Sequence, residues 1–151
     1  MTRDLQRSRR TVLKTGAAAI AGAPALAGCG GGGGGSGKFG GFMDGVGNYD
    51  GTVTDRTGQD EVTITVGVDG NGGHLAFGPP AVRVSTGTTV VWTWSGKGGS
   101  HNVVDEGGSF ESKLTAEAGF TFDQTVDSAQ TVKYYCQPHR MRGMKGVVVV
   151  E

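Results

Sequence analysis

Alternation of apolar and polar residues is the main pattern of the chain from Glu61 onward, where helical periodicity is absent. Val62, Ile64, Val66 and Val68 alternate with threonine and glycine. A period of two is typical of a strand with one buried face. Turn sequences rich in glycine, proline and asparagine separate this run from similar short runs at residues 81–84, 89–94 and 120–122. The pattern therefore predicts short strands joined by turns.

Short strands at this spacing, with few helix formers between them, indicate an all-β fold, an antiparallel Greek-key β-sandwich or barrel. Val90, Trp92 and Trp94 should share one face of a strand, and we expect that face to line the core. The run 146–150 is apolar on both faces, which is expected of a strand buried between two neighbours. Ser112–Gly119 is the one segment that could form a helical turn.

The glycine content divides the chain into a linker and a single domain. The chain has 151 residues, enough for one ordinary core, and 30 of them are glycine. Twelve of these glycines lie between Gly28 and Gly47 without the three-residue period of collagen. Because glycine-rich chain behaves as a flexible coil, we expect residues 29–49 to be a tether and residues 50–151 to be the folded domain. The few aromatic residues and the methionine of the tether could be a docking motif, but we expect them to pack loosely on the domain.

Residues 1–28 have the features of an export signal. A basic cluster precedes fourteen small or apolar residues and Cys29, and this apolar stretch is too short to span a bilayer, which takes ~20 residues. Residues 8–14 resemble a twin-arginine signal, and residues 26–29 resemble a lipobox, where cleavage leaves a lipidated cysteine. We expect a lipid at Cys29 to anchor the protein to the outer face of the cell membrane. The alternative is an uncleaved amphipathic anchor.

The neutral overall charge hides two unlike parts. The chain has fourteen basic and fourteen acidic residues, but five of the basic residues and one acidic residue precede Cys29. The mature protein would therefore carry nine basic and thirteen acidic residues. Since nucleic-acid binding requires a basic face, this mildly acidic composition argues against nucleic acid as a partner.

Cys136 needs an explanation, because lipidation of Cys29 would leave it without a disulfide partner in an exported protein. It could be a buried core residue, a catalytic nucleophile or a metal thiolate. A nucleophile paired with a histidine requires an orienting carboxylate, and no acidic residue lies between Asp127 and Glu151. We therefore do not expect an enzyme.

The neighbours of Cys136 favour the metal thiolate. His139, Met141 and Met144 follow within eight residues and add an imidazole and two thioethers, which together are soft ligands suited to copper. A trigonal site needs a second imidazole, from His74 or His101. The spacing favours His101, because it follows a glycine-rich turn and can project from the end of a strand.

The pattern His101-Asn102, followed by Tyr135-Cys136-Gln137-Pro138-His139 and Met144, resembles the plastocyanin-type blue copper proteins, and among them the halocyanins, small membrane-anchored proteins of haloarchaea. The resemblance covers residues 50–151 and implies a cupredoxin-like fold. It implies one type 1 copper ion that alternates between Cu(I) and Cu(II). The ligands that it implies are His101, Cys136, His139 and Met144.

The resemblance also assigns roles around the metal. It favours Met144 over Met141, which is only two residues past His139 and would crowd the turn. His139 would be the ligand nearest the surface and the exit for the electron. Asn102 would join the two ligand-bearing segments and shield the sulfur.

The function implied is that of a monomeric one-electron carrier between membrane-associated redox partners at the outer cell surface. Because no ligand position is left for a substrate, the site would transfer electrons without bond chemistry. The alternative is a lipoprotein that delivers or stores copper. Three basic residues near the ligands, Arg140, Arg142 and Lys145, could orient the copper end toward an acidic surface of a redox partner.

Overall fold

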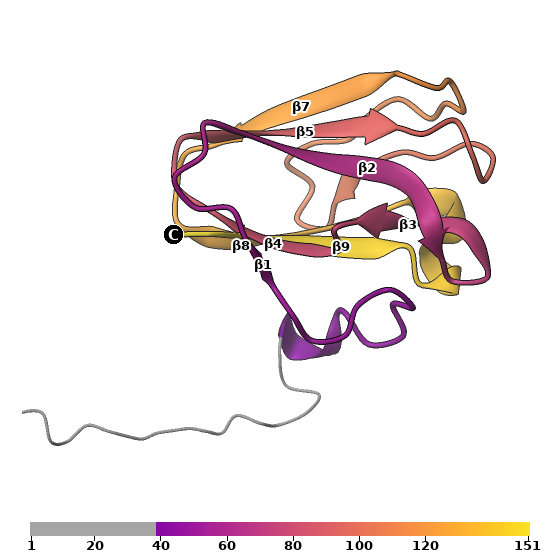
Figure 1. The fold of residues 1–151 in the computed structure, drawn as a ribbon, viewed down its shortest axis with the longest axis horizontal. Helices are drawn as coiled ribbons and strands as arrows, with labels where there is room; N and C mark the ends of the chain where they lie inside the picture. Colours follow the sequence, from indigo (N-terminus) through magenta and orange to yellow (C-terminus); the bar gives the residue numbers. More distant parts are fainter. Residues whose placement is uncertain (1–38) are drawn as a thin grey trace, which may run out of the picture. The chain divides into compact units, whose positions relative to one another are not determined.

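The computed structural model describes residues 39–151 of the chain (Figure 1). The predicted export signal, lipobox and first part of the tether lie outside these residues. One compact unit extends from Phe42 to Glu151. Among the described residues, no helix is both long and apolar enough to cross a membrane.

The domain consists of two β-sheets that lie one above the other (Figure 1). The first sheet contains, in spatial order, β1 (Thr54–Asp55), β4 (Ala81–Val84), β9 (Lys145–Val150), β8 (Gln130–Tyr135) and β6 (Val104–Asp105). The second contains β3 (Gly73–Gly78), β2 (Glu61–Gly70), β5 (Thr88–Trp94) and β7 (Thr121–Val126). The predicted all-β sandwich is thus confirmed.

Both sheets are mixed, although the short strands with few helix formers between them suggested an antiparallel fold. β2 pairs in parallel with β5, and β4 pairs in parallel with both β1 and β9. The remaining strand pairs are antiparallel. Parallel neighbours require a long crossover connection, and here the chain between β2 and β5 forms β3 and then crosses to the other sheet as β4.

The core is formed by the facing sides of the two sheets. Burial alternates along β5, and Val90, Trp92 and Trp94 are buried as expected. The Trp92 ring packs against Tyr134 of β8 with ring centres 5.2 Å apart, which links the two sheets. In β9 the consecutive residues Val147 and Val148 are both buried, although their side chains point to opposite faces of the sheet. Val148 belongs to the core cluster between the sheets, and Val147 lies outside that cluster.

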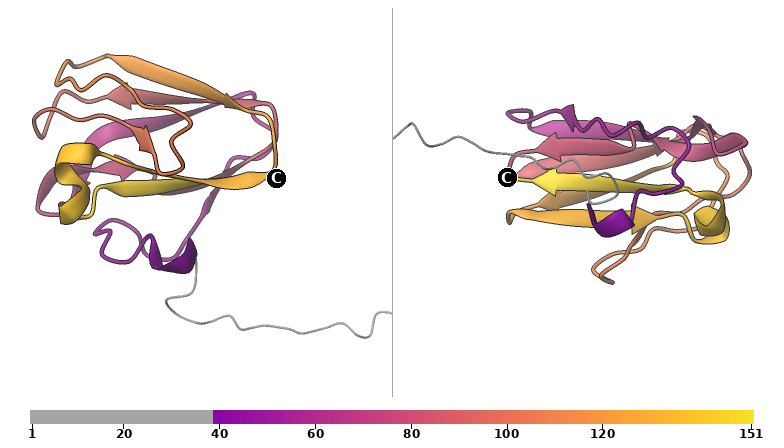
Figure 2. Two further views of the ribbon diagram at one scale, coloured as in Figure 1. Left: turned by 180° about the vertical axis from the view of Figure 1, so that it is seen from behind. Right: turned by 90° about the horizontal axis from the view of Figure 1, so that it is seen from below.

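Residues 42–49, here called the N-terminal strap, pack on the domain although they belong to the expected tether. The strap lies outside the sheet that contains β8 and β9 (Figure 2). Met43 and Val46 are buried, and the side-chain amide Nδ2 of Asn48 donates a 2.8 Å hydrogen bond to the backbone carbonyl of Phe77. Burial of the two apolar side chains offsets the conformational entropy of this glycine-rich segment.

The segment Ser112–Gly119 forms no helical turn, contrary to the expectation. Its backbone instead pairs with the chain around His101, since Thr115 and His101 exchange hydrogen bonds of 2.9 and 3.1 Å. Ser112 donates a 2.8 Å backbone bond to Val103. A short 3₁₀-helix, η3 (Gln137–Arg142), forms in the loop between β8 and β9.

Candidate metal centre

Three of the predicted metal ligands meet at one end of the sandwich. The ligand atoms of His101, Cys136 and His139 all lie within 4.8 Å of one another. The Cys136 sulfur is 3.7 Å from Nδ1 of His101 and 3.4 Å from Nδ1 of His139. His101 and Cys136 are fully buried, whereas His139 is partly exposed. His74 lies exposed in β3 and is not part of this group.

The His101 ring is oriented by the turn that precedes it. Its Nε2 lies 2.7 Å from the carbonyl oxygen of Lys97. Because a carbonyl can only accept, Nε2 carries the ring proton, and Nδ1 keeps the lone pair that a metal would use. The indole N–H of Trp94 donates a 3.1 Å hydrogen bond to the backbone carbonyl of His101. This bond fixes the backbone of His101 as well as its ring.

Two glycines permit this close packing around His101. A Cβ atom on Gly98 would overlap the carbonyl oxygen of His74 and lie 2.9 Å from His101 Nε2. A Cβ atom on Gly67 would lie 2.8 Å from the Lys97 carbonyl oxygen. Both residues also have left-handed backbones, with φ of +84° and +95°, a region that favours glycine. The orientation of His101 therefore depends on glycine at both positions.

The loop after β8 holds the other ligands. Cys136 is the extended residue that precedes η3, and Pro138 lies in the first turn of this helix, where its fixed φ is favourable. Gly143 ends the helix in the left-handed conformation. Two hydrogen bonds then close the loop, from Cys136 N–H to the Met144 carbonyl at 3.0 Å and from Met144 N–H to the His139 carbonyl at 3.2 Å.

The two candidate methionines have opposite environments. Met144 is fully buried in the cluster that also contains Cys136. Met141 is 96% exposed on η3. The structure thus favours Met144 as the thioether close to the donors.

Asn102 joins the two segments that carry ligands. Its side-chain oxygen accepts a 2.8 Å hydrogen bond from the backbone N–H of Gln137, and the residue is almost completely buried. Since Asn102 follows His101 and Gln137 follows Cys136, this bond fixes the spacing of the two ligand-bearing segments.

Burial also shifts the proton affinities of the donors. Burial lowers the pKa of His101. The hydrogen bond to the Lys97 carbonyl raises this pKa in part, and the nearby His139 lowers it further. Burial and the charge of Arg142 lower the pKa of His139. Burial raises the pKa of the Cys136 thiol, and hydrogen bonds from backbone groups of Asn102 and His139 oppose this by lowering it. Both imidazoles are therefore neutral near pH 7, and metal binding would displace the thiol proton.

The donor set fits a copper ion. Two ligands bound at ~2.0 Å and ~2.3 Å in a trigonal plane around a first-row metal lie about 3.7 Å apart, close to the sulfur–nitrogen distances of 3.7 and 3.4 Å found here. Two imidazoles and a thiolate with a weak axial thioether suit both oxidation states of copper. The residues present can thus hold a single copper ion.

Two of the three basic residues near the donors have partners within the domain. Arg140 stacks on the ring of Tyr135 at 4.1 Å and forms a 3.4 Å ion pair with Glu106. Lys145 donates to the carbonyl of Asp44 at 3.3 Å. Arg142 is exposed. The sequence offered no signal for the contacts with Glu106 and Asp44, because these partners are 34 and 101 positions away.

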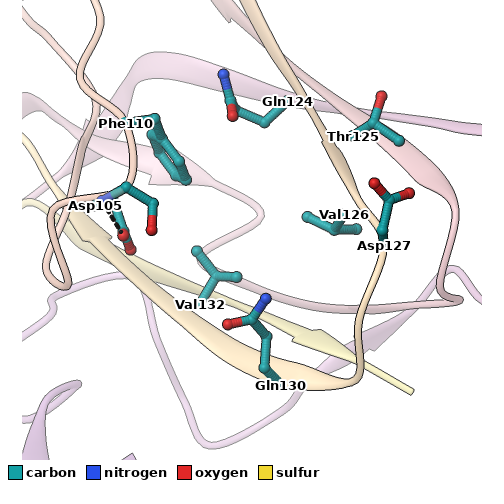
Figure 3. Close-up of a pocket in the computed structure, with 9 residues that line it drawn as sticks. Asp105, Phe110, Gln124, Thr125, Val126, Asp127, Gln130 and Val132 are labelled. Atoms are coloured by element: carbon teal, nitrogen blue, oxygen red, sulfur yellow. Dashed lines mark hydrogen bonds between the residues drawn. The ribbon is translucent and has the colours of Figure 1, made fainter.

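A separate pocket of about 130 Å³ lies between the edges of the two sheets (Figure 3). Asp105 of β6, Val132 of β8 and Gln124 of β7 are among the residues that line it. The lining includes none of the three clustered donors, so this pocket is distinct from the metal centre.

Comparison with known protein families agrees with the geometry. The profile of the copper binding proteins of the plastocyanin/azurin family matches residues 63–151. Halocyanin from Natronomonas pharaonis is 54% identical over 106 residues, which cover 68% of this chain and 64% of the halocyanin. Plastocyanin from Scenedesmus fuscus is 34% identical over 101 residues, which cover 60% of this chain and all of that protein.

Solved structures show the same fold. A purple cupredoxin from Nitrosopumilus maritimus superposes with a TM-score of 0.50 at 26% identity, over 60% of this chain and 99% of the cupredoxin. A mutant plastocyanin of a fern gives a TM-score of 0.51 at 26% identity, over 60% of this chain and all of the fern protein.

Proposed function

Because the chain belongs to the plastocyanin/azurin family of copper-binding proteins, we propose that it is a one-electron carrier with a single type 1 copper ion. The observation that supports this most is the meeting of two imidazole nitrogens and one thiol sulfur in a buried cluster. The proposed ligands are His101, Cys136, His139 and Met144. Bound copper would supply reversible exchange of one electron between Cu(II) and Cu(I).

The chain contributes a rigid and partly enclosed holder for the metal. His101 is fixed by the Lys97 carbonyl, and Cys136 is fixed through the loop hydrogen bond to Met144. Because the packed core resists movement of these ligands, little rearrangement would accompany a change of charge. His139 is the most exposed of the three clustered donors, so it would form the contact through which electrons enter and leave.

The proposed cellular setting rests on sequence features of residues 1–49. In this proposal residues 1–28 are a cleaved twin-arginine-type signal with a lipobox, and a lipid on Cys29 anchors the protein to the outer face of the membrane. The glycine-rich residues after Cys29 would let a monomeric copper domain, within the predicted span 50–151, move between membrane-associated redox partners. Mass spectrometry of the membrane-extracted protein would test the anchor, since an unmodified Cys29 contradicts it.

Titration of the purified domain with Cu(II) tests the electron-carrier function. We expect one copper ion per chain, an intense blue colour from the thiolate–copper bond, and reversible bleaching by a mild reductant. A colourless complex that releases copper rapidly to a chelator would contradict the proposal and favour copper delivery or storage.

Met144→Leu is expected to keep the blue colour and raise the reduction potential of the copper protein. Leucine has similar volume but no sulfur, and loss of a weak axial donor favours Cu(I). Voltammetry of both proteins measures the difference. An unchanged or lower potential would show that the Met144 sulfur is not a ligand.

Arg142→Gln is expected to slow electron exchange with an anionic probe, hexacyanoferrate, on the order of threefold at low ionic strength, because charge near the exit steers encounter. The difference should disappear at high salt. Arg56→Gln is the matched control. Arg56 directly follows β1, beside the last residues of β4 and β9, whereas the ligand loop leads into the first residue of β9, so Arg56 lies at the other end of the sheet. Equal rates for both variants would rule out a docking role for Arg142.

A further inference from the structure

The side chain of Asn71 joins three separate segments of the domain. Its oxygen accepts a 2.7 Å hydrogen bond from the backbone N–H of Gly47 in the N-terminal strap. Its amide nitrogen donates to the carbonyls of Leu75 at 2.7 Å and of Gly143 at 3.0 Å. Asn71 has a φ of +60°, a conformation that asparagine tolerates better than most residues. One side chain therefore connects the strap, strand β3 and the end of the ligand loop.

The strap lies directly against the ligand loop at this point. A Cβ atom on Gly143 would overlap the carbonyl oxygen of Gly45 and would lie 2.7 Å from Asn71 Oδ1. Gly143 is buried and immediately precedes Met144. The strap backbone and the Asn71 amide thus form one wall of the turn that leads to the proposed axial ligand.

A second contact holds the other side of Met144. Lys145 follows this methionine, and its ammonium group donates to the carbonyl of Asp44 at 3.3 Å and lies 5.4 Å from the centre of the Phe42 ring. The strap therefore contacts both residues that flank Met144. Residues 42–49 precede the segment 63–151 that matches the family, so these contacts come from outside that segment.

We propose that Asn71 is a positioning residue that, together with the N-terminal strap, sets the place of Met144 relative to the other three ligands. The proposal rests on the copper-carrier function proposed above. The physical reason is that a thioether binds copper weakly at long distance, so the protein rather than the metal decides where the sulfur lies. A small displacement of the Gly143–Lys145 backbone would then change the strength of the axial donor.

Two substitutions at Asn71 separate its hydrogen bonds from its backbone conformation. Asn71→Gly removes all three hydrogen bonds but accepts the left-handed conformation without strain. Asn71→Asp keeps an acceptor for Gly47 but replaces the donor to Leu75 and Gly143 by an oxygen, which would repel both carbonyls. The matched control is Thr88→Val, which removes a 2.9 Å bond to the Gln59 carbonyl at the end of β5 remote from the ligands.

Hydrogen exchange of the metal-free variants gives a readout that does not depend on copper. In Asn71→Gly we expect the amides of Gly143 and Met144 to exchange roughly five- to tenfold faster than in the unmodified protein. In Asn71→Asp the increase should be at least as large. Thr88→Val should leave these two amides unchanged after correction for global stability. Equal exchange in all four proteins would overturn the proposal.

The reduction potential of the copper-loaded variants completes the test. Both Asn71 variants should have a potential shifted in the same direction as that of Met144→Leu and by a smaller amount, whereas Thr88→Val should not shift. If Met144→Leu shifts the potential but the Asn71 variants do not, the positioning role is wrong and the proposed function stands. If the unmodified protein gives no blue, reversible copper site, the proposed function itself fails.

Discussion

Replacing Cys136 by alanine is expected to abolish the blue colour of the copper-loaded protein completely and leave the β-sandwich folded. The colour requires a copper–thiolate bond, and Cys136 is the buried thiol of the described domain. The folded state should survive, because the core is formed by strands whose packing does not depend on a metal. Loss of one buried sulfur should cost about 1 kcal/mol of unfolding free energy. Visible absorption after copper addition and denaturant unfolding of the metal-free protein measure the two effects.

Cys136→Ser provides the comparison for this result. Serine preserves the size of the side chain and could still offer an oxygen donor, but it cannot supply a thiolate. We expect a colourless protein with weaker copper binding. Persistence of the blue band in either variant would show that the thiolate assignment is wrong, and unfolding of metal-free Cys136→Ala would show that the domain depends on this residue for its fold.

Replacing Gly98 by alanine is expected to destabilise the domain by roughly 3 kcal/mol and to disrupt the copper site. The left-handed backbone at Gly98 alone costs alanine ~1–2 kcal/mol. The new Cβ would also overlap the carbonyl of His74 and approach His101 Nε2 to 2.9 Å. Since this nitrogen donates to the Lys97 carbonyl, the ring would have to move away from the position that presents Nδ1. Denaturant unfolding and the copper-dependent spectrum measure these losses.

The neighbouring Gly99→Ala is a matched control for the backbone cost. Gly99 has a φ of +87°, close to that of Gly98, but a Cβ atom there would meet nothing within 4 Å. We expect Gly99→Ala to lose only ~1–2 kcal/mol and to keep an unchanged blue site. If both variants lose the same stability and retain the same spectrum, the contact of Gly98 with His101 has no role in holding the ligand.

Much of the fold and of the donor set could be predicted from the sequence, because both depend on local patterns. Alternation identified the buried faces of β2 and β5, and the short spacing from Cys136 to Met144 placed three candidate ligands on one loop. The spacing favoured His101 over His74, the family resemblance strengthened this choice, and the cluster of donor atoms agrees with it. Parallel pairing was not predictable, since alternation is the same in parallel and antiparallel strands.

The features that escaped prediction depend on contacts between distant residues. Asn71 bonds to Gly47 and to Gly143, which are 24 and 72 positions away. In sequence it is one more polar residue in a glycine-rich turn. The glycines of the strap indicated a flexible tether with a few side chains packed loosely on the domain, and the structure shows that Met43 and Val46 are the buried ones. Composition describes the average behaviour of a segment and cannot show which few side chains find a partner.

The central position of β9 constrains the order of events during folding. This strand lies between β4 and β8, and β4 cannot join β8 without it. The ligand loop ends where β9 begins, and His101 is 35 positions from Cys136. His101 therefore reaches the loop donors only when these distant segments lie together. The full set of ligands exists only in the folded chain, so copper would bind most tightly to a site that folding has completed.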